Sequence, residues 1–434
     1  MADYDFDAIV VGAGLAGSVA AYELAKAGKS VLVVERGNYA GAKNMTGGRL
    51  YVHSLRKVFS DEDLADAPLE RRIAHERISL MTADANFTID FSSDEMSKED
   101  QASYSILRRP FDQWLASKAE EAGAEMIYGI PVESLVKDES GTVCGIRAGE
   151  DEITAQLVIL ADGVNSLLAK EAVGYEKPPA SQVAVGVKEV FQLDEKTIDD
   201  RLLCNPGEGT AWLFVGDATH GVFGGGFMYT NKDTISLGVV AGIEACASAA
   251  NATPVYQMLE DLKQHPAVAP LIRDAKVIEH SGHMVPEGGI NIMPKLVADG
   301  VMLAGDTAMM CINLGYMVRG MDYAIAAGQM AGQCAAHAID LGMVNEGVLQ
   351  SYVDVLEDSF VMKDLRQFKN EPAFLEGFDR MFGAYPDMVK DIMNGLFVVD
   401  GLPVIPFIKK IMPAIKKVGL VNIARDARGA MKAL

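Results

Sequence analysis

The chain opens with an alternation of apolar runs and glycine turns that predicts a strand–helix–strand unit. Residues 6–11 are mostly apolar and β-branched, which is typical of a strand buried on both faces. Residues 18–27 have helix-forming composition, and Gly28 is placed to end that helix. Residues 30–34 form a second apolar run that stops at Glu35. A parallel unit of this length is typical of a dinucleotide-binding fold.

Later segments return to the same pattern. Residues 111–122 predict an amphipathic helix, and residues 157–160 and 301–304 predict two further buried strands. Residues 321–339 have the length and the Ala/Gly-rich composition of a helix that packs closely against a neighbour. The chain therefore re-enters one α/β sheet more than once.

Two stretches alternate polar and apolar residues instead. Residues 77–93 do so once, and residues 183–240 do so repeatedly, with breaks at 205–207 and 224–226. Alternation with period two predicts antiparallel strands that have one buried face. We expect an inserted, mostly antiparallel sheet domain beside the α/β domain, followed by a mostly helical C-terminal region.

The turn after the first strand contains a dinucleotide fingerprint, made by Gly12, Gly14, Ala16 and Gly17. The first glycine allows a tight turn, the second lets a pyrophosphate approach the backbone, and the third lets helix and strand pack closely. The N-terminus of the helix adds partial positive charge. Glu35, at the end of the second strand, suits a ribose diol and would repel a 2′-phosphate.

Two later motifs favour FAD over NAD as the dinucleotide. Ala161, Asp162 and Gly163 follow one predicted strand, and Gly305 and Asp306 follow another. Both motifs therefore lie at the carboxyl edge of the sheet, where α/β folds bind ligands. The carboxylate of Asp306 could accept a hydrogen bond from a ribityl hydroxyl of the flavin.

The segment after Asp306 predicts how the flavin ring is bound. Gly315, Tyr316 and Met317 lie in a loop that leads into the helix predicted at 321–339. Backbone N–H groups at the start of that helix would face the N1/C2=O edge of the flavin and stabilise negative charge on it. We therefore expect an α/β, two-dinucleotide-binding-domain flavoprotein fold, with a Rossmann-like FAD domain and non-covalent FAD.

Composition and charge exclude several other classes of protein. The 434 residues carry a formal net charge of -21, which argues against nucleic acid as a partner, since phosphate binding needs a basic surface. The five cysteines contain no Cys-x-x-Cys pair, so we expect neither a disulfide scaffold nor a metal site in this chain. No secretory signal precedes the first strand, and no apolar run reaches the ~18–20 residues that span a bilayer. These features favour a cytoplasmic protein.

The last 34 residues reverse the overall charge balance. Residues 401–434 hold seven Lys or Arg residues and a single acidic residue, Asp426, with apolar side chains between them. Such a basic amphipathic stretch is typical of helices that lie on an anionic membrane surface. It is equally consistent with helices that pack against their own domain or a partner. Pro403, Pro406 and Pro413 argue against one continuous helix.

These motifs together resemble the FixC/EtfC family of flavoproteins, which is grouped with electron-transfer-flavoprotein:quinone oxidoreductases and geranylgeranyl reductases. The segments that show the resemblance are residues 35–38, 41–50, 108–112, 224–233, 286–289 and 313–322. The resemblance implies an electron-transfer oxidoreductase that takes electrons from an electron-transfer flavoprotein and passes them through FAD to quinone. It also implies membership of an electron-bifurcating FixABCX-like complex, located peripherally on the inner face of the cell membrane.

The partners implied by the resemblance are the alpha and beta subunits of electron-transfer flavoprotein and a FixX-like ferredoxin. Family members that act as single-chain quinone oxidoreductases bind an iron–sulfur cluster through C-terminal cysteines, whereas this chain has no cysteine after Cys334. A four-iron cluster needs about four thiolates. We therefore expect any such cluster on a partner subunit only.

The resemblance also implies which residues bind the cofactor. It places Gly12, Gly14 and Gly17 on the pyrophosphate and Glu35 on the adenosine ribose. Arg36 would lie beside the adenine, Val132 at its edge, and Arg108 near the phosphates or the ribityl chain. The further residues expected along the flavin are Lys43, Asn44, Gly47, Gly48, Arg49, Gly305, Asp306, Gly315, Tyr316 and Met317. Lys43, Arg49 and Arg319 are candidates for tuning the flavin, and no other catalytic residue is expected.

The domain boundaries follow from the same interpretation. We expect a discontinuous FAD-binding domain at 1–76, 102–181 and 273–345. The antiparallel-sheet domain, for substrate or quinone, would comprise 77–101 and 182–272. The C-terminal helical region would comprise 346–434 and contact a membrane or a partner.

Three alternatives remain open at this point. The chain could reduce a prenyl lipid or another apolar organic substrate directly, or it could be a flavin monooxygenase. It could also be an assembly subunit whose FAD is structural. His280 and His283 could be structural residues or could take part in quinone protonation, since no acidic or cysteine partner at ligand spacing supports a metal site.

Overall fold

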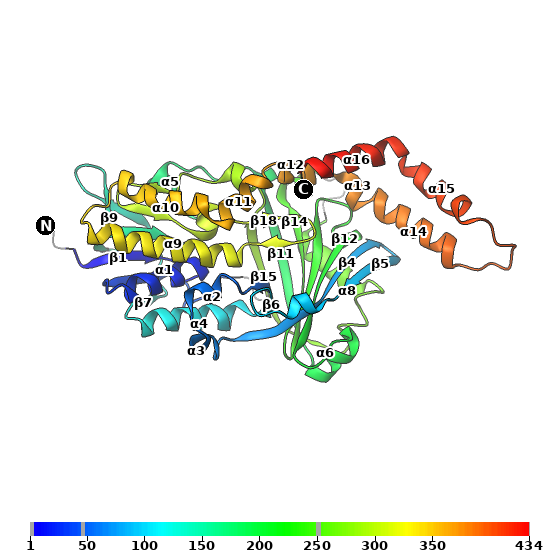
Figure 1. The fold of residues 1–434 in the computed structure, drawn as a ribbon, viewed down its shortest axis with the longest axis horizontal. Helices are drawn as coiled ribbons and strands as arrows, with labels where there is room; N and C mark the ends of the chain where they lie inside the picture. The colour runs from blue at the N-terminus through cyan, green and yellow to red at the C-terminus, as the bar shows by residue number, and fades with distance from the viewer. Residues whose placement is uncertain (1–3, 45–47, 249–252, 434) are drawn as a thin grey trace.

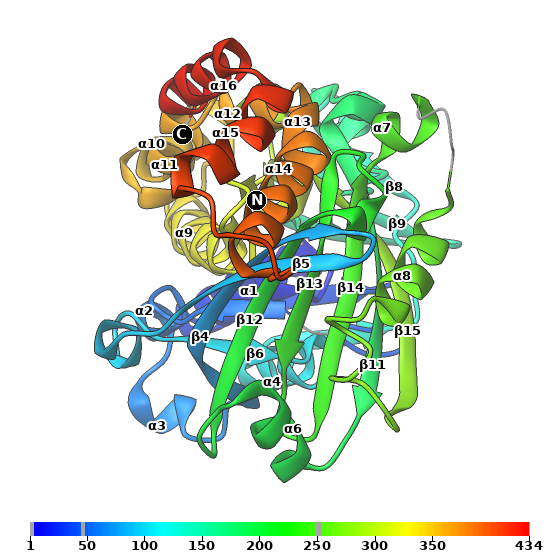
Figure 2. The ribbon, with the colours of Figure 1, turned by 90° about the vertical axis from the view of Figure 1, so that its right-hand side faces the viewer.

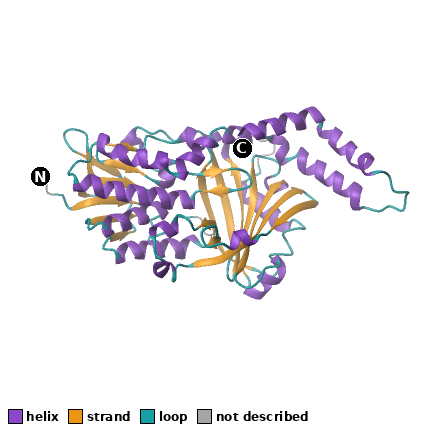
Figure 3. Cartoon of the chain, viewed as in Figure 1, coloured by secondary structure: helices purple, strands orange, loops and turns teal. Residues whose placement is uncertain are grey.

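The computed structural model describes residues 4–44, 48–248 and 253–433. Two large sheets lie side by side along the long axis of the molecule, and C-terminal helices extend from the second one (Figure 1; Figure 3). This arrangement confirms the α/β flavoprotein class with an added sheet and a helical C-terminal region.

The first sheet is the dinucleotide-binding sheet. Its strand order is β16-β17-β10-β1-β2-β7, with β8 and β9 attached beside β10. Strand β1 is parallel to both β10 and β2, so the three carboxyl ends meet at one edge. The bounds are β1 (Phe6–Val11), β2 (Val31–Glu35), β7 (Glu125–Tyr128), β8 (Ser134–Lys137), β9 (Val143–Ala148), β10 (Asp151–Leu160), β16 (Val297–Ala298) and β17 (Val301–Leu303).

Three helices cover this sheet: α1 (Leu15–Lys26), α4 (Arg108–Glu121) and α9 (Met321–Asp340). The Ala/Gly-rich composition of α9 permits very close packing on α1. A Cβ atom added at Gly328 would lie 2.3 Å from the carbonyl oxygen of Ala16, and one at Gly332 would lie 2.6 Å from that of Ala20. Helices α1 and α4 begin three residues earlier than the sequence predicts, so that α4 includes Arg108 in its first turn.

The second sheet has nine strands in the order β15-β11-β14-β13-β12-β4-β6-β3, with β5 beside β4. Its pairing is antiparallel, as predicted, except that β12 runs parallel to β4. The bounds are β3 (Gly48–Tyr51), β4 (Leu69–Thr82), β5 (Ala85–Phe91), β6 (Ser103–Ile106), β11 (Val183–Gln192), β12 (Glu208–Gly216), β13 (Gly224–Thr230), β14 (Thr234–Gly242) and β15 (Lys276–Pro286). Strands β3, β6 and β15 come from segments that the sequence assigned to the FAD-binding domain, whose boundaries stay a prediction.

The remaining helices are short or C-terminal. They are α2 (Leu55–Val58), α3 (Asp61–Leu64), α5 (Ala169–Val173), α6 (Glu195–Leu202), α7 (Ile243–Ser248), α8 (Val255–Gln264), α10 (Glu346–Asp358), α11 (Phe360–Gln367), α12 (Glu371–Glu376), α13 (Asp379–Phe382), α14 (Ala384–Phe397), α15 (Phe407–Val418) and α16 (Leu420–Ala433). A two-stranded hairpin, β18 (Ile312–Asn313) and β19 (Val318–Arg319), precedes α9.

Helices α14 and α15 pack against each other and project beyond the body of the molecule (Figures 1 and 2). Two of the three prolines act as the sequence predicts, since Pro403 lies in the loop and Pro406 caps α15. Pro413 does not break the helix but lies inside α15, which ends instead just before Gly419. Within the described ranges, no helix is both long and apolar enough to cross a membrane.

Candidate functional site

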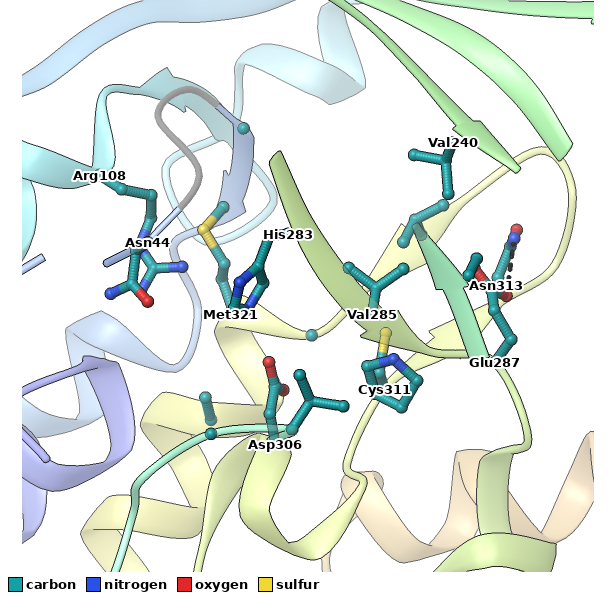
Figure 4. Close-up of a pocket in the computed structure, with 18 of the residues that line it drawn as sticks. Asn44, Arg108, Val240, His283, Val285, Glu287, Asp306, Cys311, Asn313 and Met321 are labelled. Atoms are coloured by element: carbon teal, nitrogen blue, oxygen red, sulfur yellow. Dashed lines mark hydrogen bonds between the residues drawn. The ribbon is translucent and has the colours of Figure 1, made fainter. Parts of the chain in front are cut away.

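A cavity of about 640 Å³ separates the two sheets. One end is formed by the carboxyl edge of the first sheet, where Gly12, Asp162 and Asp306 follow β1, β10 and β17, and Glu35 ends β2. The other end is walled by the second sheet and by helices α12 and α13. Figure 4 shows Arg108 and Asn44 on one side of it, Asp306, His283 and Val285 in the middle, and Glu287 with Asn313 on the other side.

The glycine turn after β1 leaves room for a ligand at one position only. Gly12 has φ +100°, and a Cβ atom there would lie 2.4 Å from the carbonyl oxygen of Ala161. A Cβ atom on Gly17 would lie 1.9 Å from the carbonyl oxygen of Gly12. At Gly14, by contrast, the nearest atom is Asn44 Nδ2 at 3.9 Å, so this position borders open cavity.

The N-terminus of α1 is built to bind an anion. Its first turn is buried, yet Gly14, the capping residue, provides no side-chain hydrogen bond and the turn contains no acidic residue. The orphan N–H groups of a buried helix start need a partner, and a phosphate is well suited to them. Together with the clearance at Gly14, this donor set fits the pyrophosphate of a dinucleotide.

Glu35 is fixed at the rim of the cavity by two backbone amides. Its Oε2 accepts the N–H of Ala13 at 2.9 Å, and its Oε1 accepts the N–H of Gly37 at 2.6 Å. Arg36 and Val132 line the cavity beside it. This corner therefore has the acidic and apolar groups expected around an adenosine.

Arg108 is held over the cavity by Asp112, one turn further along α4. Its Nε and Nη2 atoms donate to the two carboxylate oxygens at 2.8 and 2.9 Å. Asp112 is fully buried and also accepts a hydrogen bond from Asn44. A Cβ atom on Gly41, which has φ +83°, would lie 2.9 Å from Asp112 Cβ, so the segment before Asn44 packs tightly on α4.

The two Gly-Asp motifs meet through Thr307. Its hydroxyl donates to Asp162 Oδ1 at 3.1 Å and accepts the N–H of Gly163 at 2.8 Å. Asp306 lies on the cavity wall, where burial raises the pKa of its carboxyl group and the positive charge of Arg108 opposes the rise. Gly305 has φ +65° and packs against Ala16, which brings this motif close to α1.

The three candidates for tuning a flavin differ in their surroundings. Lys43 and Arg49 line the cavity, and Arg49 forms an ion pair with Glu76. Arg319 does not line it, because its guanidinium is engaged by Asp322 at 2.8 Å and by Asp364 at 2.7 Å. Arg319 therefore braces the first turn of α9.

Most of the residues predicted from sequence come together on the cavity wall. Those that line it are Gly12, Gly14, Ala16, Glu35, Arg36, Lys43, Asn44, Gly48, Arg49, Arg108, Val132, Ala161, Asp162, Gly163, Asp306, Gly315 and Tyr316. Gly17, Gly305, Met317 and Arg319 lie off the wall, the two glycines because they are packing positions. Gly47 lies outside the described residues.

Sequence reasoning missed the other half of the site. The second sheet and the C-terminal helices add the apolar side chains Ile78, Leu213, Phe214, Phe223, Phe227, Val240, Val285, Phe374, Leu375, Phe378, Met381 and Phe382 to the wall. It also missed Tyr229, Glu287, Cys311 and Asn313 as cavity residues. The period-two alternation indicates which side chains share a face but not which face borders the cavity.

His280 and His283 lie on opposite faces of β15. His283 lines the cavity, and burial lowers its pKa, with the charges of Arg108 and Arg36 lowering it further. His280 is half exposed and lies 3.4 Å from a carboxylate oxygen of Glu189. Only His283 is therefore placed to act on a bound molecule.

A fold and a donor set of this kind define an FAD-binding flavoprotein, and comparison with known families agrees. Residues 5–223 match the FAD binding domain, and residues 371–434 match the ETF-QO/FixC family C-terminal domain. Protein FixC of Salmonella typhi is 49% identical over 429 residues, which cover 98% of each chain. The chain therefore belongs to the FixC/ETF-quinone oxidoreductase family.

Further comparisons agree with this assignment. "Probable electron transfer flavoprotein-quinone oxidoreductase YdiS" of Escherichia coli K12 is 48% identical over 426 residues, 98% of each chain. Among solved structures, a geranylgeranyl bacteriochlorophyll reductase-like protein of Thermoplasma acidophilum matches with a TM-score of 0.71 at 20% identity, covering 98% of this chain and 99% of that one. The structural match supports the fold, and the sequence matches support the family. The chain is accordingly an FAD-dependent oxidoreductase of this family.

Proposed function

We propose that this chain accepts electrons from an electron-transfer flavoprotein and passes them to a quinone, as one subunit of an electron-bifurcating complex. The observation that carries the proposal is a single cavity that joins the dinucleotide fingerprint to an apolar compartment. Electron transfer is fast when cofactor and acceptor lie close together, and one cavity of this kind would hold both side by side.

The residues at the polar end would hold non-covalent FAD. Gly14 and the N-terminus of α1 would bind the pyrophosphate, Glu35 the ribose, and Arg108 with Asp306 the ribityl portion. The uncapped N-terminus of α9, at Gly320, would stabilise negative charge on the ring. Bound FAD supplies reversible one- and two-electron chemistry, so no nucleophile or general-base triad is needed.

The apolar end would bind the quinone. The C-terminal family domain contributes Phe374, Leu375, Phe378, Met381 and Phe382 to this part of the wall. Aromatic and aliphatic side chains exclude water and suit a planar ring with a hydrocarbon tail. The acceptor would thus be bound by the domain that characterises the family.

The partners follow from the same proposal. The electron donor would be the two-subunit electron-transfer flavoprotein, and an iron–sulfur cluster would be on a FixX-like subunit. The five cysteines of this chain are scattered, and all five are free in the structure. The loop between α14 and α15, with its exposed Val399 and Val404, and the lysines of α15 would contact the cytoplasmic face of the membrane, where quinone resides.

Anaerobic stopped-flow of the FAD-loaded chain tests the proposal. The flavin absorbance is followed after mixing with NADH alone, and separately after mixing with the reduced partner flavoprotein, then with a quinone analogue. Slow reduction by NADH, fast reduction by the partner and reoxidation by quinone are expected. Rapid reduction by NADH alone would instead favour a reductase that acts directly on an organic substrate.

A further inference from the structure

Glu287 forms part of the cavity wall on the side away from Arg108 (Figure 4). It directly follows β15, and its backbone N–H donates to the carbonyl oxygen of Gln182 at 2.9 Å. Its Oε2 accepts a hydrogen bond from Asn313 Nδ2 at 3.1 Å. Asn313 is itself oriented, because its Oδ1 accepts the N–H of Gly315 at 2.9 Å. The carboxyl group of Glu287 is therefore held in a fixed position at the cavity.

Glu371, the first residue of α12, is a second buried carboxyl group near Glu287: its neighbour Pro372 packs on the segment after Glu287, where a Cβ atom on Gly289 would lie 3.6 Å from Pro372 Cγ. Only 3% of Glu371 is exposed, and the charge of Glu287 acts on it. Burial raises the pKa of Glu287 to about 7, with the hydrogen bond from Asn313 opposing the rise. Burial, with the charge of Glu287 adding to it, raises the pKa of Glu371 to about 8. Near pH 7 the Glu287 carboxyl is therefore about half protonated and the Glu371 carboxyl mostly protonated, so both can release and regain a proton in this range.

No cation neutralises this pair among the described residues. The other titratable groups near it are the Cys311 thiol, whose pKa burial raises, and the carboxyls of Asp306 and Asp322, which act on the same thiol. His283 lies on β15, four residues before Glu287, but its pKa is influenced by Arg108 and Arg36 instead. A salt bridge therefore does not account for the presence of Glu287 at the cavity. A buried carboxyl group without a cation is costly when it is ionised.

We propose that Glu287 donates a proton to the quinone oxygen during reduction and that Glu371 restores the proton to Glu287. Reduction of a quinone takes two electrons, which arrive through the flavin, and two protons. The O–H bond of Glu287 breaks as one quinone oxygen gains its proton, and the second oxygen takes a proton from solvent. Glu371 then reprotonates Glu287 and is itself reprotonated from solvent. The inference rests on the proposed function, because it assumes a quinone in this cavity.

The experiment compares an acceptor that needs protons with one that does not. The FAD-loaded chain is reduced chemically under anaerobic conditions and mixed with decylubiquinone or with ferricyanide, from about pH 6 to 9, which spans the pKa values of both carboxyls. The variants are Glu287→Gln and Glu371→Gln. Glu376→Gln, an exposed position on the same helix, is the matched control.

For the native chain, the rate of reoxidation by quinone should fall as pH rises through about 7 to 8, because Glu287 and Glu371 lose their protons. Glu287→Gln should slow this step on the order of 10²-fold, the usual size of a general-acid effect, and remove the pH dependence. Glu371→Gln should slow it less, since solvent can still reprotonate Glu287. Reoxidation by ferricyanide should stay unchanged in all variants.

Four results would overturn the inference. Glu287→Gln could leave the quinone rate and its pH profile intact, or it could slow ferricyanide equally, which would indicate a structural role. A fall in rate centred below pH 6.5 that is abolished by His283→Asn would assign the proton to His283, whose pKa is lowered from 6.5. If quinone fails to reoxidise the native chain while ferricyanide succeeds, the proposed acceptor is wrong, and the inference fails with it.

Discussion

Arg108 and Asp112 form a two-point ion pair within the first two turns of α4, with donor–acceptor distances of 2.8 and 2.9 Å. Asp112 is fully buried, and Arg108 is the member of the pair that reaches the cavity. Planar guanidinium–carboxylate pairing of this kind fixes orientation as well as charge. Asp112 therefore positions a cation beside the proposed ribityl and phosphate portion of FAD without touching it.

Replacing Asp112 by Asn tests this positioning role. The substitution keeps the volume but leaves Arg108 without its counter-charge, and breaking a buried pair costs about 3–5 kcal/mol. We expect a lower free energy of unfolding and weaker FAD binding, measured by denaturant titration and by flavin fluorescence. Glu357→Gln, which breaks the partly exposed pair with Arg366, should cost at most about 1 kcal/mol and leave FAD affinity intact. Equal effects of both substitutions would contradict the role of Asp112.

Alanine substitutions should distinguish the role of Gly14 in ligand binding from the role of Gly17 in packing. Gly14 has φ -82°, which alanine adopts freely, and its Cβ would point into open cavity. Gly14→Ala should therefore fold normally but weaken FAD binding at least tenfold, or about 1.4 kcal/mol. Gly17→Ala should destabilise the fold itself, since the added methyl would clash with the carbonyl oxygen of Gly12. Thermal unfolding of the flavin-free chain and FAD titration measure the two effects, and a stability loss in Gly14→Ala would contradict the assignment.

The local part of the fold could be predicted because short-range chemistry determines it. The glycine turn, Glu35 at the end of β2 and the close-packed α9 each depend on residue types at fixed spacing, and the structure has all three. The two Gly-Asp motifs were also predictable, since the carboxyl ends of parallel strands must share one edge.

The apolar half of the cavity could not be predicted in the same way. Phe227 and Val240 lie on β13 and β14, which come from the segment that alternates polar and apolar residues. That alternation does not tell which face of the sheet meets the cofactor domain. Phe378, which caps α13, and Phe382, its last residue, lie more than 130 positions after Val240 in sequence, so only tertiary packing brings them to the cavity. Arg319 is a residue that the sequence suggested for the site but the structure places elsewhere. Its guanidinium is engaged by Asp322 and Asp364 and not by the cavity.

The burial of Lys188 predicts that the free energy of unfolding rises with pH. Its side chain is fully buried on β11, and its Nζ has no hydrogen-bond partner among the described residues. Burial lowers its pKa from 10.5 to about 7, with Glu279 opposing the shift and Arg108 adding to it. Below pH 7 both folded and unfolded chains carry the charge, so the full cost of burying it is present. Between about 7 and 10.5 only the unfolded chain stays protonated, and stability rises with pH.

Lys188→Met should therefore raise the unfolding temperature most below pH 7, and the gain should shrink by about pH 9. Lys263→Met is the control of opposite sign, because Lys263 pairs with Glu189 and Glu260 and its pKa is raised. That substitution should destabilise the chain at both pH values. Differential scanning calorimetry measures both series, and a pH-independent gain in Lys188→Met would disprove the cost assigned to the buried charge.

The hairpin of α14 and α15 predicts binding to anionic membranes. Its loop exposes Val399 and Val404, each 87% accessible, and Lys409 and Lys416 are exposed on α15 nearby. Apolar side chains insert into the interface, and the lysines beside them interact with anionic headgroups, each contributing about 1 kcal/mol. The double variant Val399→Glu/Val404→Glu should lose most of its co-sedimentation with phosphatidylglycerol vesicles. Lys409→Gln/Lys416→Gln should weaken binding by about tenfold or more and reduce its salt dependence.

Leu203→Glu provides the matched control for this test, since Leu203 is 76% exposed next to α6, away from the hairpin in Figure 1. It should bind vesicles as the native chain does. Unchanged binding of the Val399/Val404 variant, or equal binding to neutral phosphatidylcholine vesicles, would contradict membrane docking. If the Val399/Val404 variant loses vesicle binding but keeps electron transfer to a water-soluble quinone, the hairpin determines location rather than chemistry, because neither Val399 nor Val404 lines the cavity.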